Sequence, residues 1–252
     1  MLYDVLFLFL DSIPTVTFLA WFLVAYLALH PVVYYILMNS KKFASVTYDK
    51  QSYILCNIME VMVLVILTYI ALTALWRGDI NLMDTGNHKQ NPQIMINIAT
   101  MYTMKDIVEI FVNKRIARST IIHHICVIMA YIYVLRVLTT DFNVEGIFKC
   151  FIGYAGFTTL DFPYEIYLAL RFFIDKQGRL NHVCKRYAFF HNFLCVFSNF
   201  SWQTFYFIKL TTTFYTSGSS ILALLLSSLV YSLLMAGWVQ EEYVVMDHLW
   251  NL

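Results

Sequence analysis

The sequence predicts an all-α, polytopic membrane protein with about seven transmembrane helices in one bundle. Of its 252 residues, 60% are hydrophobic and only 13% are charged, whereas a soluble domain carries about 25% charged residues. The length suits one compact bundle without an additional soluble domain. The net charge of +1 provides no overall field that would attract nucleic acid, so no nucleic-acid partner is expected.

Seven apolar segments approach the length of about 20 residues that a spanning helix needs. We expect helices at residues 13–38, 53–76, 95–113, 120–138, 146–173, 188–210 and 219–239. Pro31 and Pro163 fall inside the first and fifth segments, where we expect kinks. Residues 1–12 then form a short N-terminal segment, residues 13–239 the bundle and residues 240–252 a tail.

The distribution of Lys and Arg predicts the orientation. Basic residues gather in the connections 39–52, 114–119 and 174–187, whereas the three alternate connections hold only Arg77 and Lys89. Because basic connections stay on the cytosolic side, we expect a lumenal N-terminus and a cytosolic C-terminus. An odd number of spans agrees with this arrangement.

Ionisable side chains lie where hydrocarbon alone would not favour them. His123 and His124 open the fourth apolar segment, TIIHHICVIMAYIYVL, and Asp106 and Asp161 lie in the third and fifth. Ionisable groups within a membrane usually mark functional sites. A rise of 1.5 Å per residue places Asp106 about 10 Å, and the histidines about 5–8 Å, from the cytosolic ends of their helices. These three side chains are therefore expected at overlapping depths.

Further polar residues follow helical spacing and are candidates for substrate binding. On the sixth segment Asn192, Asn199 and Gln203 share a face, and Tyr131 lies on the same face as His124. The candidate substrate-binding residues are Tyr131, Glu165, His191, Asn192, Asn199 and Gln203. Two alternatives stay open: the Asn and Gln side chains form hydrogen bonds between helices, and Lys105 forms a simple ion pair with Glu109 four residues later.

The stretch DIVEIFVNKRIARSTIIHHICVIMAYIYVL resembles the TLC (TRAM–LAG1–CLN8) domain. In that family an acidic helix is followed by a short basic cytosolic loop and a helix that opens with a His-His pair. The later TTLDFPYEIYLAL is similar to the segment that carries an aspartate in ceramide synthases, and Asp161 is the matching position. The resemblance covers residues 50–240 and is closest to the small TLC-domain proteins. It implies a bundle around a central, lipid-accessible cavity in the endoplasmic reticulum membrane.

Two functions follow from this resemblance. The first is acyl transfer from acyl-CoA to a long-chain amine, as in sphingolipid synthesis, with His123 and His124 as the reactive pair and Asp106 and Asp161 orienting them. The second is non-enzymatic, in which the cavity binds a long-chain base, acyl chain or phospholipid for sensing, trafficking or regulation. No tightly bound cofactor is expected, acyl-CoA being a co-substrate. Assembly into homo-oligomers stays open.

A metal-dependent desaturase or hydroxylase is a weaker alternative. Such sites need many histidines at HxxxH or HxxHH spacing, whereas only one pair clusters among the seven histidines here. The cysteines form no CxxC pair and are interpreted as small core residues. The sequence therefore predicts no metal site.

Overall fold

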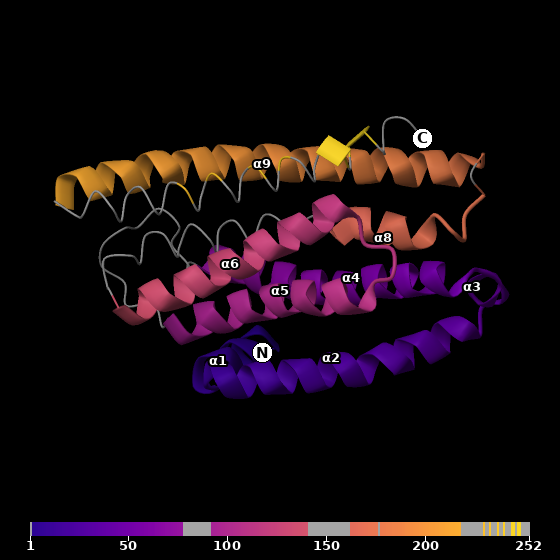
Figure 1. Ribbon diagram of the computed structural model, residues 1–252, viewed down its shortest axis with the longest axis horizontal. Helices are drawn as coiled ribbons and strands as arrows, with labels where there is room; N and C mark the ends of the chain where they lie inside the picture. The colour runs from indigo at the N-terminus through magenta and orange to yellow at the C-terminus, as the bar shows by residue number, and fades with distance from the viewer. Residues whose placement is uncertain are drawn as a thin grey trace.

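The computed structural model describes residues 2–77, 92–140, 162–175 and 177–217, together with single positions between 229 and 247. Within these residues all regular secondary structure is helical, as the sequence predicts (Figure 1). The helices are α1 (Leu2–Ser12), α2 (Thr15–Met38), α3 (Lys41–Ser45), α4 (Tyr48–Arg77), α5 (Pro92–Val112), α6 (Arg118–Thr140), α8 (Phe162–Leu170) and α9 (Arg179–Ser217).

The first four predicted spans correspond to α2, α4, α5 and α6. The seventh, 219–239, and most of the fifth lie outside the continuously described residues. Pro31 lies inside α2, whereas Pro163 lies in the first turn of α8 as the structure describes it.

The sixth predicted span, 188–210, lies within α9, which begins earlier, at Arg179. Hydropathy indicates which part of a helix is apolar enough to lie in lipid. It does not indicate where the backbone hydrogen bonds of the helix begin or end. The first turns of α9 are polar, and they follow directly from Gly178. The connection 39–52 likewise contains the short helix α3 and the start of α4.

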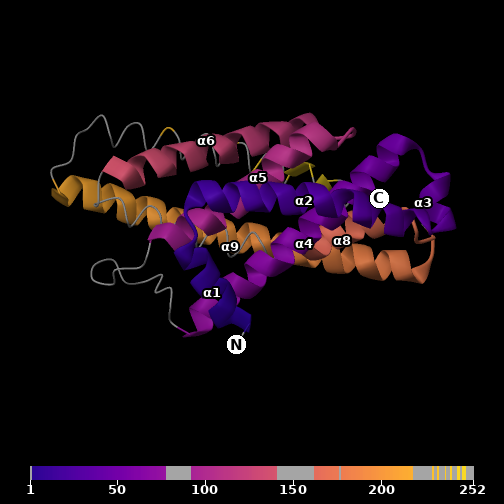
Figure 2. The ribbon, with the colours of Figure 1, turned by 90° about the horizontal axis from the view of Figure 1, so that it is seen from below.

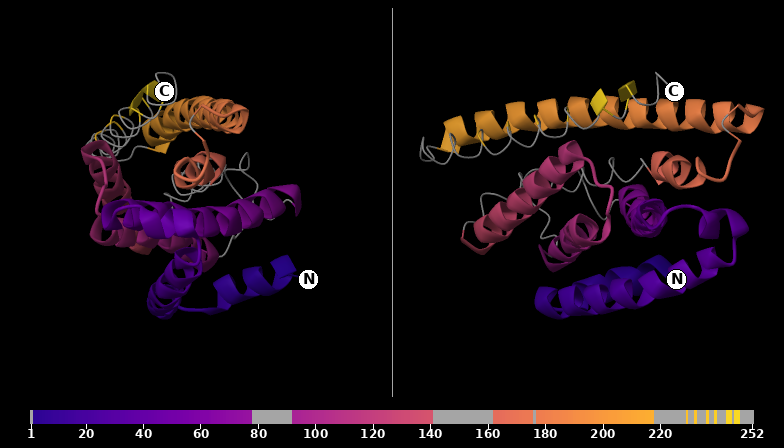
Figure 3. Two further views of the ribbon diagram at one scale, coloured as in Figure 1. Left: turned by 90° about the vertical axis from the view of Figure 1, so that its right-hand side faces the viewer. Right: turned by 45° about the vertical axis from the view of Figure 1, so that its right-hand side comes forward.

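Helices α4 and α5 lie at the centre of the bundle. Helix α5 contacts α1, α2, α4 and α6, whereas α4 also contacts α8, on which α9 packs. Figure 1 shows α9 and α2 on opposite sides with α4 and α5 between them, and Figure 3 shows the same order from two further directions. In the view of Figure 2, α1 runs at a steep angle to α2.

An extended apolar core forms around one face of α4. Leu55, Met59, Val63, Leu67 and Ile70 are buried and recur every three or four residues, so they share a face of the helix. Side chains from α1, α2 and α5 complete this core: Leu10, Phe18, Tyr26, Ile98, Met101 and Val108.

Among the described residues, two helices are long and apolar enough to cross a membrane: Thr15–Met38, with 24 residues, and Tyr48–Ile70, with 23. The outer surface of α2 is apolar, with large side chains such as Trp21, Val24 and Leu27 exposed. A continuous apolar surface of this kind is unfavourable in water and favourable in lipid. The two helices therefore support membrane association.

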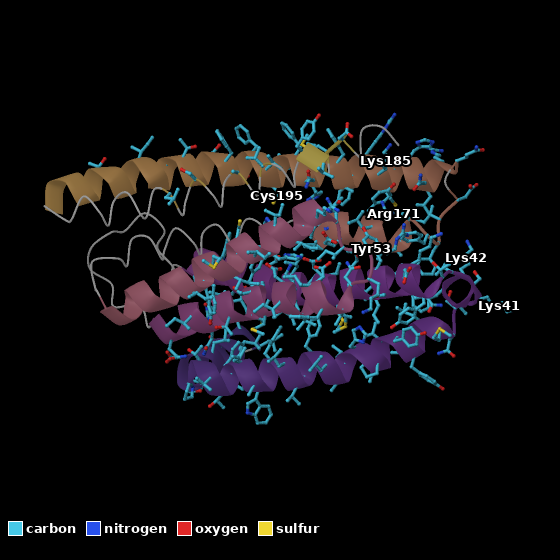
Figure 4. All side chains as sticks on the ribbon, viewed as in Figure 1. Lys41, Lys42, Tyr53, Arg171, Lys185 and Cys195 are labelled. Carbon is cyan, nitrogen blue, oxygen red and sulfur yellow. The ribbon has the colours of Figure 1, made fainter. Side chains whose placement is uncertain are left out.

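The basic connections gather at one end of the bundle. Figure 1 shows the turns between α2 and α4, between α5 and α6, and between α8 and α9 at the same end. Figure 4 places Lys41, Lys42, Arg171 and Lys185 toward that end. Here Lys42 Nζ donates a hydrogen bond to the Phe173 carbonyl oxygen at 2.7 Å, which ties α3 to the segment after α8. We call this end the basic end.

Two leucines of α4 provide a test of this core. Leu67 is 2% exposed and Leu72 is 49% exposed. We expect Leu67→Ala to lower the free energy of unfolding by about 2–5 kcal/mol, because it leaves a cavity. Leu72→Ala, which leaves none, should change it by less than about 0.5 kcal/mol. Thermal unfolding of both variants in one mild detergent measures the difference, and equal effects would contradict the assigned faces of α4.

Candidate functional site

Ionisable side chains from three helices meet in the interior of the bundle. We call this group the histidine–carboxylate cluster; its members are Glu60 of α4, Lys105, Asp106 and Glu109 of α5, and His123 and His124 of α6. Asp106 lies six residues before the end of α5, and His124 six residues after the start of α6. Each is thus about 9 Å from the end of its helix nearest the α5–α6 turn, in agreement with the overlapping depths predicted from the sequence.

His124 lies between two carboxylates of α5. Its Nε2 is 3.2 Å from Glu109 Oε2, and its Nδ1 is 3.4 Å from Asp106 Oδ2. The two acids are three residues apart on one helix, so they share the face that meets α6. Because an ionised carboxylate only accepts hydrogen bonds, the Glu109 contact places a proton on Nε2.

Lys105 neutralises the other side of Asp106. Its Nζ lies 2.7 Å from Asp106 Oδ1 and forms a second ion pair with Glu60 of α4. It also lies 4.9 Å from the centre of the Tyr102 ring, which faces the ammonium group. Lys105 is nearly fully buried, and Asp106 has no exposed surface. This ammonium group therefore connects α4 to the α5–α6 pair.

The turn that follows α5 holds Glu109 in position. Asn113 Nδ2 donates to Glu109 Oε1 at 2.9 Å, and Asn113 Oδ1 accepts from the Arg115 backbone amide at 2.9 Å. Ser52 of α4 donates to the Val112 carbonyl oxygen at 2.7 Å. The direction of the Glu109 carboxylate is thus set by backbone as well as by side chains.

Among Asp106, His123 and His124, His123 is the least buried, with 8% of its surface exposed. Its ring is 5.7 Å from that of His124, in an edge-to-face arrangement. One donor atom each from Asp106, His123 and His124 lie within 4.8 Å of one another. The three catalytic candidates that the structure describes therefore meet; the fourth, Asp161, lies outside the described residues.

Tyr131 also faces α5, as its spacing from His124 predicts. Its hydroxyl hydrogen-bonds to that of Thr100, two helical turns from His124 and farther from the basic end. The same α5–α6 interface thus continues from the cluster toward the opposite end.

The remaining substrate-binding candidates lie on α8 and α9. Glu165 Oε2 accepts from Asn57 Nδ2 of α4 at 2.8 Å. The His191 ring packs against Tyr187, with centroids 4.4 Å apart, and Asn192 is fully buried. Asn199 and Gln203 lie on α9, but their side chains are outside the described part of the chain.

The sequence identified Asp106 and the histidines but did not assign their partners. The intrahelical Lys105–Glu109 ion pair was wrong: within the described residues Lys105 pairs with Glu60 and Asp106, and Glu109 with His124. The spacing of Asp106 and Glu109 by three residues was the signal that both acids face α6. Nothing local indicated that Glu60, which is 45 residues from Lys105, belongs to the same cluster.

In comparisons with known proteins, no family model, curated protein or solved structure matches this chain.

Two charge changes test whether Lys105 holds the cluster together. Lys105→Met removes the cation from two carboxylates, so we expect a loss of about 3–5 kcal/mol in the free energy of unfolding. Glu60→Gln should cost less, because Lys105 retains Asp106 and the amide still accepts a hydrogen bond. Thermal unfolding in detergent measures both effects.

Lys41→Met is the matched control, because Lys41 is exposed at the basic end. It should change the free energy of unfolding by less than about 0.5 kcal/mol. An effect of Lys105→Met no larger than that of Lys41→Met would show that Lys105 is not a buried partner of these carboxylates.

Proposed function

We propose that this protein is a membrane-embedded enzyme of lipid metabolism that transfers an acyl group from a thioester such as acyl-CoA to a long-chain amine. The observation that carries the proposal is the position of His124 between Asp106 and Glu109, with His123 beside it, in the interior of a bundle with an apolar surface. Packing alone does not require a buried histidine between two carboxylates, and ionisable groups within a membrane usually mark functional sites.

Acyl transfer makes two demands on a site. The amine nitrogen forms a bond to the thioester carbon and loses a proton, while the carbon–sulfur bond breaks and the thiolate takes up a proton. An imidazole can accept the first proton and deliver it to the sulfur. Charge that develops on the imidazole and on the substrate must be stabilised at the same time.

The proposal assigns these tasks within the cluster. His123, the more accessible imidazole, is the proton acceptor. His124 is a positioning residue, since both of its nitrogens face carboxylates that stabilise positive charge at the His pair. Lys105 supplies the fixed positive charge near the reaction, and Asp161 is expected to orient the pair from the fifth span.

The arrangement of the helices supports an approach of the acyl donor from the basic end. The cluster is about 9 Å from the α5–α6 turn, which lies at the basic end. Lysine and arginine side chains there suit the phosphates of acyl-CoA. We place the basic end in the cytosol, the N-terminus in the lumen and the protein in the endoplasmic reticulum membrane, with about seven spans in a TLC-type bundle.

The second candidate function is non-enzymatic lipid binding. The burial of Asp106 and His124 favours it, because both groups already have partners in the protein and little surface for a substrate. In this case the polar groups hold a lipid headgroup, and His123→Gln, which keeps hydrogen-bonding capacity, should be tolerated.

The two functions predict different results for one assay. We expect purified wild-type protein in lipid nanodiscs, given acyl-CoA and a long-chain base, to form an N-acyl product. His123→Ala should lower the rate by about 100-fold or more, because it removes the proton acceptor. Product formation is measured by mass spectrometry.

The control variant is His182→Ala, which removes an exposed histidine from the first turn of α9 and should leave the rate unchanged. Equal rates for His123→Ala and wild type would exclude the proposed role of His123. Co-purification of one lipid with wild type and His123→Gln, without any product, would establish the binding function instead.

A further inference from the structure

Asp106 Oδ2 and His124 Nδ1 face each other in the buried interior of the cluster. The two atoms are 3.4 Å apart, beyond the range of about 2.7–3.2 Å for a hydrogen bond from nitrogen to oxygen. Neither atom forms a hydrogen bond of ordinary length, although Asp106 is fully buried and His124 nearly so. Buried polar atoms in proteins are almost always well hydrogen-bonded, so this long contact calls for an explanation.

We infer that Asp106, His123 and His124 form a binding site for one divalent transition-metal ion, of which Zn²⁺ is the representative. The proposed ligands are Asp106 Oδ2, His124 Nδ1 and one ring nitrogen of His123. This inference goes beyond the proposed function, and its test does not depend on acyl transfer.

The spacing of the donor atoms fits such an ion. Around a tetrahedral Zn²⁺ with bonds of about 2.0–2.2 Å, neighbouring ligand atoms are about 3.3–3.6 Å apart. The Asp106–His124 separation of 3.4 Å falls in that range. One ligand atom from each of Asp106, His123 and His124 lies within 4.8 Å of the others, so His123 has to move toward the other two to complete three ligands. Two imidazoles and one carboxylate form a donor set typical of divalent first-row metals.

The surroundings of His124 have the form of a second coordination shell. Histidines that bind a metal through one nitrogen commonly donate the other N–H to a carboxylate, which fixes the tautomer. Glu109 Oε2 lies 3.2 Å from His124 Nε2 and directs the proton to that nitrogen, leaving a lone pair on Nδ1. Asn113 in turn donates to Glu109 at 2.9 Å, and Lys105 occupies Asp106 Oδ1, leaving Oδ2 for the ion.

The cluster holds three carboxylates, those of Glu60, Asp106 and Glu109, and one lysine, Lys105. This excess of acidic groups favours a cation bound at Asp106 and the histidines. Under the proposed function it would occupy the lone pairs that accept the amine proton, so added Zn²⁺ should inhibit acyl transfer.

Metal binding can be measured on the full chain in nanodiscs after removal of bound metal by a chelator. Zn²⁺ is titrated by calorimetry, and the metal content is counted by elemental mass spectrometry after dialysis. We expect one Zn²⁺ per chain, with affinity lowered more than about 100-fold by His123→Ala, since loss of a second-shell partner alone costs about 10–100-fold. Glu109→Gln should fall within that smaller range.

A matched control and a second readout make the result decisive. His182→Ala removes an exposed histidine of α9 outside the cluster and should leave the affinity unchanged. X-ray absorption of the wild-type Zn²⁺ complex should show two imidazoles and additional oxygen ligands, without the need for any variant to fold. Absence of stoichiometric binding, equal affinity of wild type and His123→Ala, or a spectrum without imidazole would each overturn the inference. Absence of acyl transfer by the metal-free wild-type protein, with Zn²⁺ binding as expected, would contradict only the proposed function.

Discussion

The carboxylate of Asp106 lies where neither water nor lipid can solvate it, so its contacts with Lys105 and His124 determine how the centre of the molecule packs. Lys105 reaches α4 through Glu60, and His124 belongs to α6. Removing any one partner leaves a buried charge uncompensated, which costs several kcal/mol. The positions of α4, α5 and α6 relative to one another therefore depend on one connected set of charges as much as on apolar packing.

This arrangement inverts the usual distribution of a soluble protein. Large apolar side chains cover the outside of α2 and α6, whereas acids, a lysine and histidines occupy the interior. In hydrocarbon an apolar surface has no cost, and the polar groups that remain must satisfy one another or serve a ligand. The proposed acyl transfer depends on the imidazoles and the fixed charge of this interior, and the proposed metal ion would use the same groups.

Much of the architecture could be predicted from hydropathy, because α2, α4, α5 and α6 each coincide with one of the predicted apolar segments. The start of α9 could not be predicted from hydropathy. Its first turns are polar, and the backbone hydrogen bonds of a helix continue through polar residues as well as through apolar ones. Helical spacing and depth brought Asp106 together with the histidines and directed Tyr131 toward α5. The partners of these groups could not be predicted in the same way, because contacts such as Glu60–Lys105 join residues far apart in sequence, and packing alone decides which charges meet.

The central claim is that the histidine–carboxylate cluster lies in the part of the bundle that the membrane surrounds. Ile125, Met129 and Ile132 share the exposed face of α6, next to His124 in the sequence. Spin labels can be attached at Ile125→Cys and Met129→Cys in a chain without its native cysteines and studied in nanodiscs. Their collisions are measured with molecular oxygen, which dissolves in lipid, and with a nickel complex that stays in water. We expect frequent collisions with oxygen and few with nickel at both positions. Frequent collisions with nickel would place this face in water and contradict the claim.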